Sequence, residues 1–308
     1  MKHLKRKAAL LACMLSVCCF SATFAACDSG ITSFYYDNED KYTIATDAAI
    51  DQTIESLHVC WIEGSVKVDY HNEDTVLIEE YSIFREPRSD ETMRFWLDGT
   101  TLRIQYAKSG IKSMKNISKN LTITLPNNWR NTAENQGNAF KSVDFETISA
   151  DITAANIAVA DLSINTVSGN IELDELFVNE DADVETVSGN VEISFENVLL
   201  DEFSLETVSG EAKIYANQIN DFEADTVSGN IHYTAAINAN SLNIEGVSST
   251  IYLNVPTVND LKLKYETTSG MLLTEFSYLK NDKVYKIENG EKEYEIQTVS
   301  GNLKIENI

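Results

Sequence analysis

A short phrase, T-V-S-G-N or a close variant, returns along most of this chain at nearly constant spacing. Successive copies lie 19, 20, 21, 19, 20, 21 and 31 residues apart when they are aligned on the first position. The aligned residues are Thr147, Thr166, Thr186, Thr207, Thr226, Gly246, Thr267 and Thr298. A constant period of this length is typical of a repeat array, in which each copy adds one structural unit to a stack.

Apolar residues alternate with polar residues on both sides of each phrase. Leu162 and Ile164 precede one copy, and Ile171 and Leu173 follow it. Period-two patterning predicts strands that bury one face. The two apolar sets lie at odd separation, so the chain must bend, and we expect the glycine to supply backbone angles that other residues resist. The pattern predicts an all-β fold, a β-solenoid whose corners are the T-V-S-G-N phrases; an antiparallel β-meander with hairpin turns is the alternative.

Stacked coils place equivalent residues above one another, about 4.8 Å apart. Threonine would then stack on threonine and serine on serine, and we expect their hydroxyls to hydrogen-bond along the stack. The predicted ladder consists of Thr166, Ser168, Gly169, Thr186, Ser188, Gly189, Thr207, Ser209, Gly210, Thr226, Ser228 and Gly229.

The same pattern occurs in weaker form before the regular copies. In "LHVCWIEGSVKV", Trp61 takes the threonine position and Gly64 takes the glycine position. We therefore predict one domain over residues 41–308. Its expected parts are irregular first coils at 41–140, regular repeats at 141–275, and a hairpin with a closing coil at 276–308. The Asn289-Gly290 pair predicts the hairpin turn, and this hairpin would cover an open end of the sheet.

These features together resemble the bacterial putative-adhesin family. The resemblance rests on the repeated corners, the early G-x-V-x-V segment that starts at Gly64, the Asn289-Gly290 pair and the closing "IQTVSGNLKIENI". It covers roughly residues 41–308. It implies a β-solenoid domain of largely unknown function on envelope proteins, and it supplies no catalytic residues.

The first 26 residues have the features of an export signal. A basic start, "MKHLKRK", is followed by the apolar stretch "AALLACMLSVCCF" and by small residues. We predict a secretory signal peptide over 1–26 and a tether over 27–40. "FAAC" resembles a lipoprotein cleavage site, although Phe24 departs from its pattern. Lipidation of Cys27 would place the protein at the cell membrane or cell surface.

Two other outcomes for the N-terminus remain open. Ordinary cleavage would give a secreted protein, and an uncleaved signal is just long enough to anchor the chain in a bilayer. If Cys27 carries no lipid, a Cys27–Cys60 disulfide becomes possible in an oxidising compartment.

The formal net charge of −24 limits the partners. Such a surface repels nucleic acid and anionic lipid headgroups, so membrane attachment is expected through the N-terminal lipid alone. The partner class that we predict is an extracellular or envelope protein or glycan.

Acidic residues recur immediately before the aligned position of the repeat. This predicted acidic column comprises Glu146, Glu185, Glu206, Asp225, Glu245 and Glu266. It is either a solvated face that keeps the solenoid soluble or a surface that attracts Ca²⁺ or cationic partners. Ca²⁺ is the only ion that the sequence suggests, and we expect no other cofactor.

The sequence carries little sign of catalysis. His58, His71 and His232 match no familiar metal-binding pair, and no P-loop or nucleophile elbow occurs. Enzymes with β-helices need acids that converge on one groove, whereas the acids here are spread evenly. We therefore predict a non-enzymatic surface binding or adhesion module; the alternative is an envelope-structural or envelope-stress protein that binds another envelope component or cationic peptides.

One segment is basic, although the chain as a whole is strongly acidic. "RIQYAKSGIKSMKNISKN" contains five basic residues and no acid: Arg103, Lys108, Lys112, Lys115 and Lys119. It predicts an exposed loop that keeps its lysines in solvent, or a contact for an anion or wall polymer.

Overall fold

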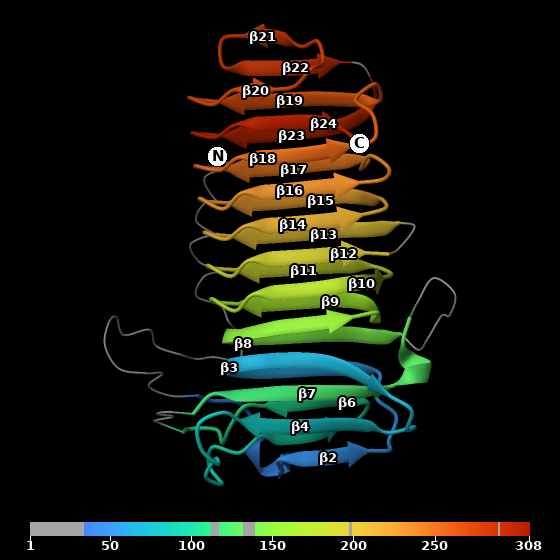
Figure 1. Cartoon of the computed structure of the whole chain (residues 1–308), viewed down its shortest axis with the longest axis vertical. Coiled ribbons are helices and arrows are strands. Elements are labelled where there is room, and N and C mark those ends of the chain that lie inside the picture. Colours follow the sequence, from blue (N-terminus) through green and yellow to red (C-terminus); the bar gives the residue numbers. More distant parts are fainter. Residues whose placement is uncertain (1–33, 112–116, 132–138, 197–198, 289) are drawn as a thin grey trace.

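The computed structural model describes residues 34–111, 117–131, 139–196, 199–288 and 290–308. Within these ranges, 24 strands join one hydrogen-bonded sheet that winds into a column of stacked coils, accompanied by two short 3-10 helices (Figure 1). The predicted signal peptide, Cys27, Lys112 and Lys115 lie outside the described residues.

The elements before the regular repeats are η1 (Glu39–Lys41), β1 (Thr43–Ile44), β2 (Asp47–Ile50), β3 (Ser56–His71), β4 (Val76–Ser82), β5 (Arg94–Asp98), β6 (Thr101–Gln105), β7 (Lys119–Pro126), η2 (Asn127–Trp129) and β8 (Phe140–Ala155). The repeats form β9 (Ala158–Thr166), β10 (Ile171–Val178), β11 (Asp181–Thr186), β12 (Val191–Phe195), β13 (Leu200–Thr207), β14 (Ala212–Ala216), β15 (Ile219–Thr226), β16 (Ile231–Ala235), β17 (Ser241–Gly246) and β18 (Ile251–Val255). The final elements are β19 (Leu261–Thr267), β20 (Leu272–Leu273), β21 (Leu279–Asn281), β22 (Val284–Glu288), β23 (Lys292–Thr298) and β24 (Leu303–Asn307).

The regular coils stack in parallel. Strands β9, β11, β13, β15 and β17 form one face, β10, β12, β14, β16 and β18 form the next, and each T-V-S-G corner joins a strand of one face to a strand of the other. Thr166, Thr186, Thr207 and Thr226 are register partners in turn. The parallel pairing confirms the β-solenoid and excludes the antiparallel meander.

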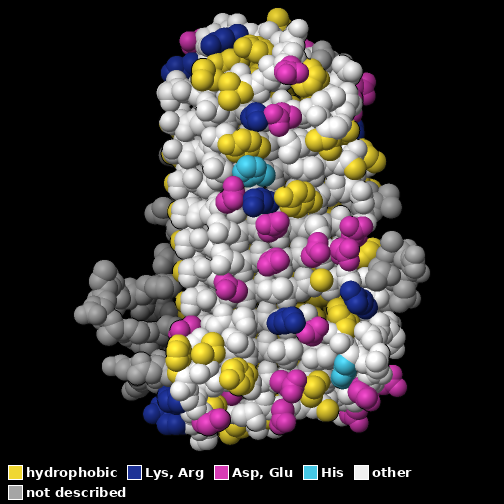
Figure 2. Space-filling view, in the orientation of Figure 1, with side chains coloured by type: hydrophobic (Ala, Val, Ile, Leu, Met, Phe, Trp, Pro, Cys, Tyr) yellow, Lys and Arg dark blue, Asp and Glu magenta, His cyan; other side chains and the backbone are white. Residues whose placement is uncertain are grey.

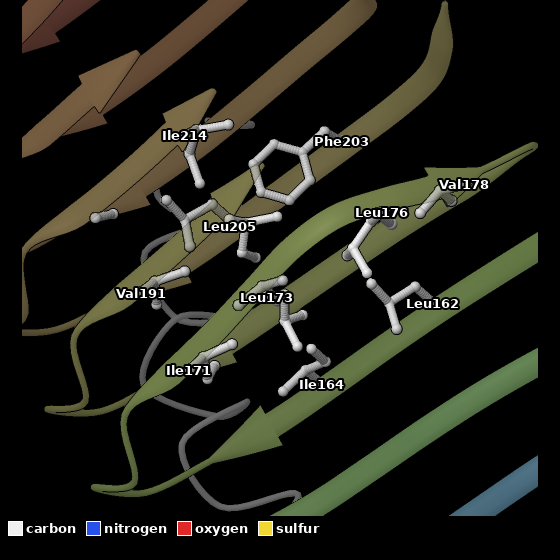
Figure 3. Close-up of a cluster of buried hydrophobic side chains, with 14 of the residues drawn as sticks. Leu162, Ile164, Ile171, Leu173, Leu176, Val178, Val191, Phe203, Leu205 and Ile214 are labelled. Atoms are coloured by element: carbon white, nitrogen blue, oxygen red, sulfur yellow. The ribbon is translucent and has the colours of Figure 1, made fainter. Parts of the chain in front are cut away.

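The core lies inside the coils. Leu162 and Ile164 of one face and Ile171 and Leu173 of the next point inward and are buried, as the period-two pattern predicts (Figure 3). Phe203 stacks on Phe222 of the following coil, with 5.2 Å between ring centroids. Each coil therefore buries the apolar face of its neighbour.

The corner glycines are required by close packing between coils and not by the special backbone angles that the sequence suggested. Gly169, Gly189, Gly210 and Gly229 do not adopt left-handed backbone angles. A Cβ atom on any of the last three would overlap the carbonyl oxygen of the glycine one coil below, and on Gly169 that of Ala150. The close approach of successive coils, and not an unusual φ, excludes side chains here.

One corner exchanges the two special positions. Gly246 replaces threonine and Ser249 replaces glycine. Ser249 is buried, and its hydroxyl occupies the space beside Gly246 where a side chain would otherwise lie. The Ser249 side chain therefore fills the space that the missing threonine side chain at position 246 leaves.

The N-terminal end closes the column with antiparallel strands. β3 pairs in parallel with β6, β7 and β8, whereas β2–β4, β4–β7, β1–β5 and β5–β6 are antiparallel pairs. Trp61 pairs with Thr147 and Gly64 with Ala150, so the weak early repeat has the predicted register.

Lys119 corrects the expectation of a solvated basic loop. It begins β7 and is fully buried. Its ammonium group donates to the carboxylate of Glu80 and to the main-chain carbonyls of Glu91 and Tyr106, and lies 4.0 Å from the centroid of the Tyr106 ring. Sequence reasoning grouped Lys119 with exposed lysines because its partners are distant in the chain.

The C-terminal coils are not stacked in sequence order. β23 lies between β17 and β19, and β24 lies between β18 and β20. β22 pairs antiparallel with β19 and with β21. Strands β22 and β23 therefore flank β19, and a hairpin joins β21 to β22 at this end. The turn predicted at Asn289-Gly290 includes Asn289, which lies outside the described residues.

Candidate functional site

The corner ladder is held together by three kinds of hydrogen bond. The threonines point inward, and Thr186 Oγ1 accepts the amide proton of Gly189 at 2.9 Å. The serines point outward, and Ser188 Oγ donates to the carbonyl of Val167 one coil below at 3.3 Å. The expected serine–serine bonds are thus replaced by serine–backbone bonds, while a direct threonine–threonine bond joins Thr147 to Thr166 at 2.7 Å.

The asparagine of T-V-S-G-N forms a ladder that sequence reasoning did not assign. Asn170 Oδ1 accepts the amide proton of Asn190 at 3.1 Å, and Asn190 Oδ1 accepts that of Glu211 at 3.0 Å. Asn230 does the same for Thr250 at 3.0 Å. The repeated N is the available signal: a carboxamide at a fixed corner position satisfies the first amide of the next coil. These contacts make the corner a structural feature.

The predicted acidic column is in register. Glu185 pairs with Glu206, Glu206 with Asp225, and Asp225 with Glu245. Asn165 separates Glu146 from Glu185, and Gln297 separates Glu245 from Glu266 because the closing coil is inserted there.

Two further outward columns run beside it on the same strands. We call the acids of these three columns on β11, β13, β15 and β17 the acidic face; they are Asp181, Asp183, Glu185, Glu202, Glu206, Asp221, Glu223, Asp225 and Glu245. By contrast, the face visible in Figure 2 carries intermixed acidic, basic and hydrophobic side chains.

Partial burial and mutual repulsion perturb the acidic face. Burial raises the pKa of Asp183, and the charges of Asp181 and Asp161 add to the effect. Burial also raises the pKa of Glu185 and of Glu206, and each is raised further by neighbouring carboxylates. The face therefore holds negative charge at an energetic cost.

The same columns are neutralised near the C-terminal end. Lys262 lies 2.7 Å from Glu293, and Lys264 lies 2.9 Å from Glu295. These pairs border a shallow groove that also includes Glu245 and Lys286. The acidic face therefore ends where the inserted coil begins.

A second cluster lies where these outward columns reach the N-terminal end. His58 and Cys60 are two residues apart on β3 and occupy outward positions. Asp144 and Glu146 on β8 are their register partners. Cys60 Sγ lies 3.3 Å from His58 Nε2, and His58 Nδ1 lies 2.7 Å from Asp144 Oδ2. One ligand atom each from His58, Cys60 and Glu146 falls within 4.8 Å of the others.

This cluster is largely shielded from solvent. Cys60 is 0% exposed and Glu146 is 6% exposed. The His58 side chain, at 13%, borders a groove lined also by Tyr36, Trp96 and Gln105. The sequence analysis did not identify this cluster, because His58 and Cys60 match no familiar metal-binding motif. The available signal is their spacing of two, which places both side chains on the same side of a strand.

The sequence model of the Toastrack DUF4097 family matches residues 63–306. The chain belongs to this family. The match confirms the predicted membership of an adhesin-like β-solenoid group. No curated protein matches the chain. The described residues include no helix that is long and apolar enough to cross a membrane.

Several crystal structures are similar to this Toastrack chain. One from Bacteroides fragilis, described as a putative adhesin, is 11% identical with a TM-score of 0.45, over 84% of this chain and 95% of that one. One from Parabacteroides distasonis, described as a putative lipid binding protein, is 14% identical with a TM-score of 0.41, over 84% and 95%. One from Clostridium sporogenes, described as a putative cell adhesion protein, is 14% identical with a TM-score of 0.21, over 87% and 98%.

Proposed function

We propose that this Toastrack protein is a non-enzymatic binding module of the bacterial envelope, exported by residues 1–26 and attached through lipid at Cys27. The observation that carries the proposal is the acidic face. Its carboxylates are aligned in columns on four successive coils, with about 4.8 Å between neighbours. A partner with regularly spaced positive charges would fit this surface.

The electrostatic cost of the acidic face supports a binding role. Neighbouring carboxylates repel each other by about 1 kcal/mol at the dielectric constant of water. The raised pKa values of Glu185 and Glu206 reflect this repulsion together with burial. A cationic partner would relieve it, and complementary charge speeds association. The preferred partner class is a basic segment of an extracellular or envelope protein, and Ca²⁺ is the second ligand to test.

The test is a binding panel on protein purified from the membranes or medium of cells that express the full chain. The panel contains mucin, matrix proteins, cell-wall fragments and a cationic peptide, each with and without EDTA. The test variant combines Asp183→Asn, Glu185→Gln and Glu206→Gln. The matched control, Glu172→Gln with Glu192→Gln and Glu211→Gln, also removes three charges: two from the neighbouring face and one from the corner beside it.

The proposal predicts saturable, salt-sensitive binding to a host or envelope component, lost in the test variant and kept in the control. Loss of binding in EDTA that added Ca²⁺ restores, and Zn²⁺ does not, would assign the contact to Ca²⁺. Binding to wall fragments alone would favour an envelope-internal partner over adhesion to a host. Equal binding by both variants would refute a role for the acidic face.

A further inference from the structure

We propose that His58, Cys60 and Glu146 bind one divalent transition-metal ion, for which Zn²⁺ is the best match. Imidazole, thiolate and carboxylate are the three ligand types that Zn²⁺ accepts in proteins. The solenoid assembles them without any local motif. Strand β3 places His58 and Cys60 on one side, and the parallel register with β8 brings Glu146 next to Cys60.

The distances suit a tetrahedral site. Bonds of about 2.0 to 2.3 Å place the ligand atoms of tetrahedral Zn²⁺ roughly 3.5 Å apart. Cys60 Sγ and His58 Nε2 are already 3.3 Å apart, and all three ligand atoms lie within 4.8 Å of one another. Small side-chain rotations would therefore bring them around one ion.

Asp144 prepares His58 for this role. A carboxylate only accepts hydrogen bonds, so the 2.7 Å contact places the proton of His58 on Nδ1. The lone pair is then on Nε2, the nitrogen that faces Cys60. Metal-ligating histidines are commonly oriented by a carboxylate in this way. Asp144 is the register partner of His58, so the same strand pairing supplies the ligand and its support.

Gln105 provides an independent indication of a ligand. It is the register partner of Cys60 on the other side, on β6, and is 2% exposed. Its Oε1 atom is buried and has no hydrogen-bond partner among the described residues. A buried unpaired carbonyl loses its hydration without replacement, which costs free energy. A metal ion, or a water bound to it, would satisfy this oxygen.

The surroundings favour a small ion over a larger substrate. Cys60, His58 and Asp144 form a chain of contacts that also occurs in thiol nucleophiles. Here the thiol is 0% exposed, so a polymer or peptide has no route to the sulfur. The groove of about 460 Å³ beside His58 and Gln105 offers access for an ion and its water molecules. Thiolate and imidazole also favour Zn²⁺ over Ca²⁺ and Mg²⁺.

The test uses the purified full chain, stripped with a chelator and titrated with Co²⁺ as a spectroscopic probe. We expect one Co²⁺ per chain, a cobalt–thiolate charge-transfer band in the near ultraviolet, and displacement of the band by one equivalent of Zn²⁺. Oxygen ligands on the acidic face cannot produce this band. His232→Gln serves as a distant histidine control and should leave the titration unchanged.

Three variants examine the ligands. Cys60→Ser should abolish the charge-transfer band, and His58→Gln should lower Co²⁺ affinity strongly. Asp144→Asn, which keeps all three ligands, should weaken affinity by about 10- to 100-fold. Circular dichroism verifies folding. Cys60 is fully buried whereas His58 is partly exposed, so His58→Gln is the decisive variant if Cys60→Ser unfolds. A folded wild-type protein without the band, or equal affinity in His58→Gln, would overturn the proposal.

Discussion

The regular coils and the N-terminal end both pack a glycine closely against the adjacent coil, but different side chains surround that contact. In the regular coils, Gly189 lies against the carbonyl of Gly169, and its amide donates to Thr186. At the N-terminal end, Gly64 lies against the carbonyl of Lys119, and Trp61 Nε1 donates to that same carbonyl at 2.7 Å. At both places a glycine packs directly against a backbone carbonyl of the adjacent coil. The neighbouring hydrogen-bonding side chain is a repeated threonine in the regular coils and the single Trp61 at the N-terminal end.

The difference separates two kinds of residue. Positions that repeat along the coils, such as Gly189 and Asn190, set the spacing or satisfy backbone groups of the adjacent coil. Positions that occur once, such as Lys119, Cys60 and His58, depend on contacts that no other coil supplies. The buried charge and the proposed metal ligands both belong to the second kind.

Lys119→Met should produce the largest change in stability. It leaves the Glu80 carboxylate buried without its cation and frees two carbonyls, so we expect a loss of about 3 to 5 kcal/mol in the free energy of unfolding. Urea denaturation measures it. Adding Glu80→Gln should recover part of the loss; a single-variant loss below about 1 kcal/mol would show that the pair is not a determinant of this end.

Gly189→Ala should strongly destabilise the regular coils. The new methyl group would overlap the backbone of Gly169, which cannot move without shifting a whole coil. We expect a loss of about 3 kcal/mol in the free energy of unfolding. The ladder position before Gly169 is Ala150, which already accommodates a methyl group, so Ala150→Gly should cost only about 1 kcal/mol or less. Equal losses would contradict the close-approach explanation.

Asn190→Ala examines one rung of the asparagine ladder. It removes the acceptor for the Glu211 amide at an exposed corner, so we expect a loss of about 1 kcal/mol. Asn190→Asp keeps an acceptor oxygen and should be milder in the same thermal or urea experiment. A neutral alanine variant would mean that water replaces the bond without cost.

Neutralising part of the acidic face should have a small effect of opposite sign. The pKa values of Asp183, Glu185 and Glu206 are raised in the fold, so these groups destabilise it above both their folded and unfolded pKa values. The Asp183→Asn, Glu185→Gln, Glu206→Gln variant should therefore gain about 1 kcal/mol at neutral pH, a value reduced by solvent screening. The gain should vanish below pH values of about 4 and shrink in high salt. A loss of stability at neutral pH would contradict it.

Much of the fold follows from the sequence because the repeat reports on backbone spacing directly. Aligning Trp61 with the threonine position gave the register of β3 with β8, and the acids before each threonine gave the column. That register also places Cys60 beside Glu146. Because His58 and Cys60 are two residues apart on a strand, the cluster of His58, Cys60 and Glu146 could have been predicted from the sequence.

Other features could not be predicted for physical reasons. The burial of Lys119 depends on Glu80 and on carbonyls from distant segments, which leave no periodic signal. The order of the last coils was also hidden. Strands β19 and β23 have the same alternation of buried and outward residues, so either could pair with β17. Nothing in the sequence of β19 or β23 shows that β23 is the strand that does so.

The insertion of β23 between β17 and β19 means that the order of synthesis differs from the order of stacking. During synthesis, β19 emerges before β23, yet β23 lies between β17 and β19 in the fold. Because β17 and β19 share a compatible register with β23, an early β17–β19 contact would be a kinetic trap that must open before the native arrangement forms. Completion of this end therefore waits for residues 292–308. Later docking of β19 would avoid this trap, whereas the opposite end can assemble as soon as β8 is available to pair with β3.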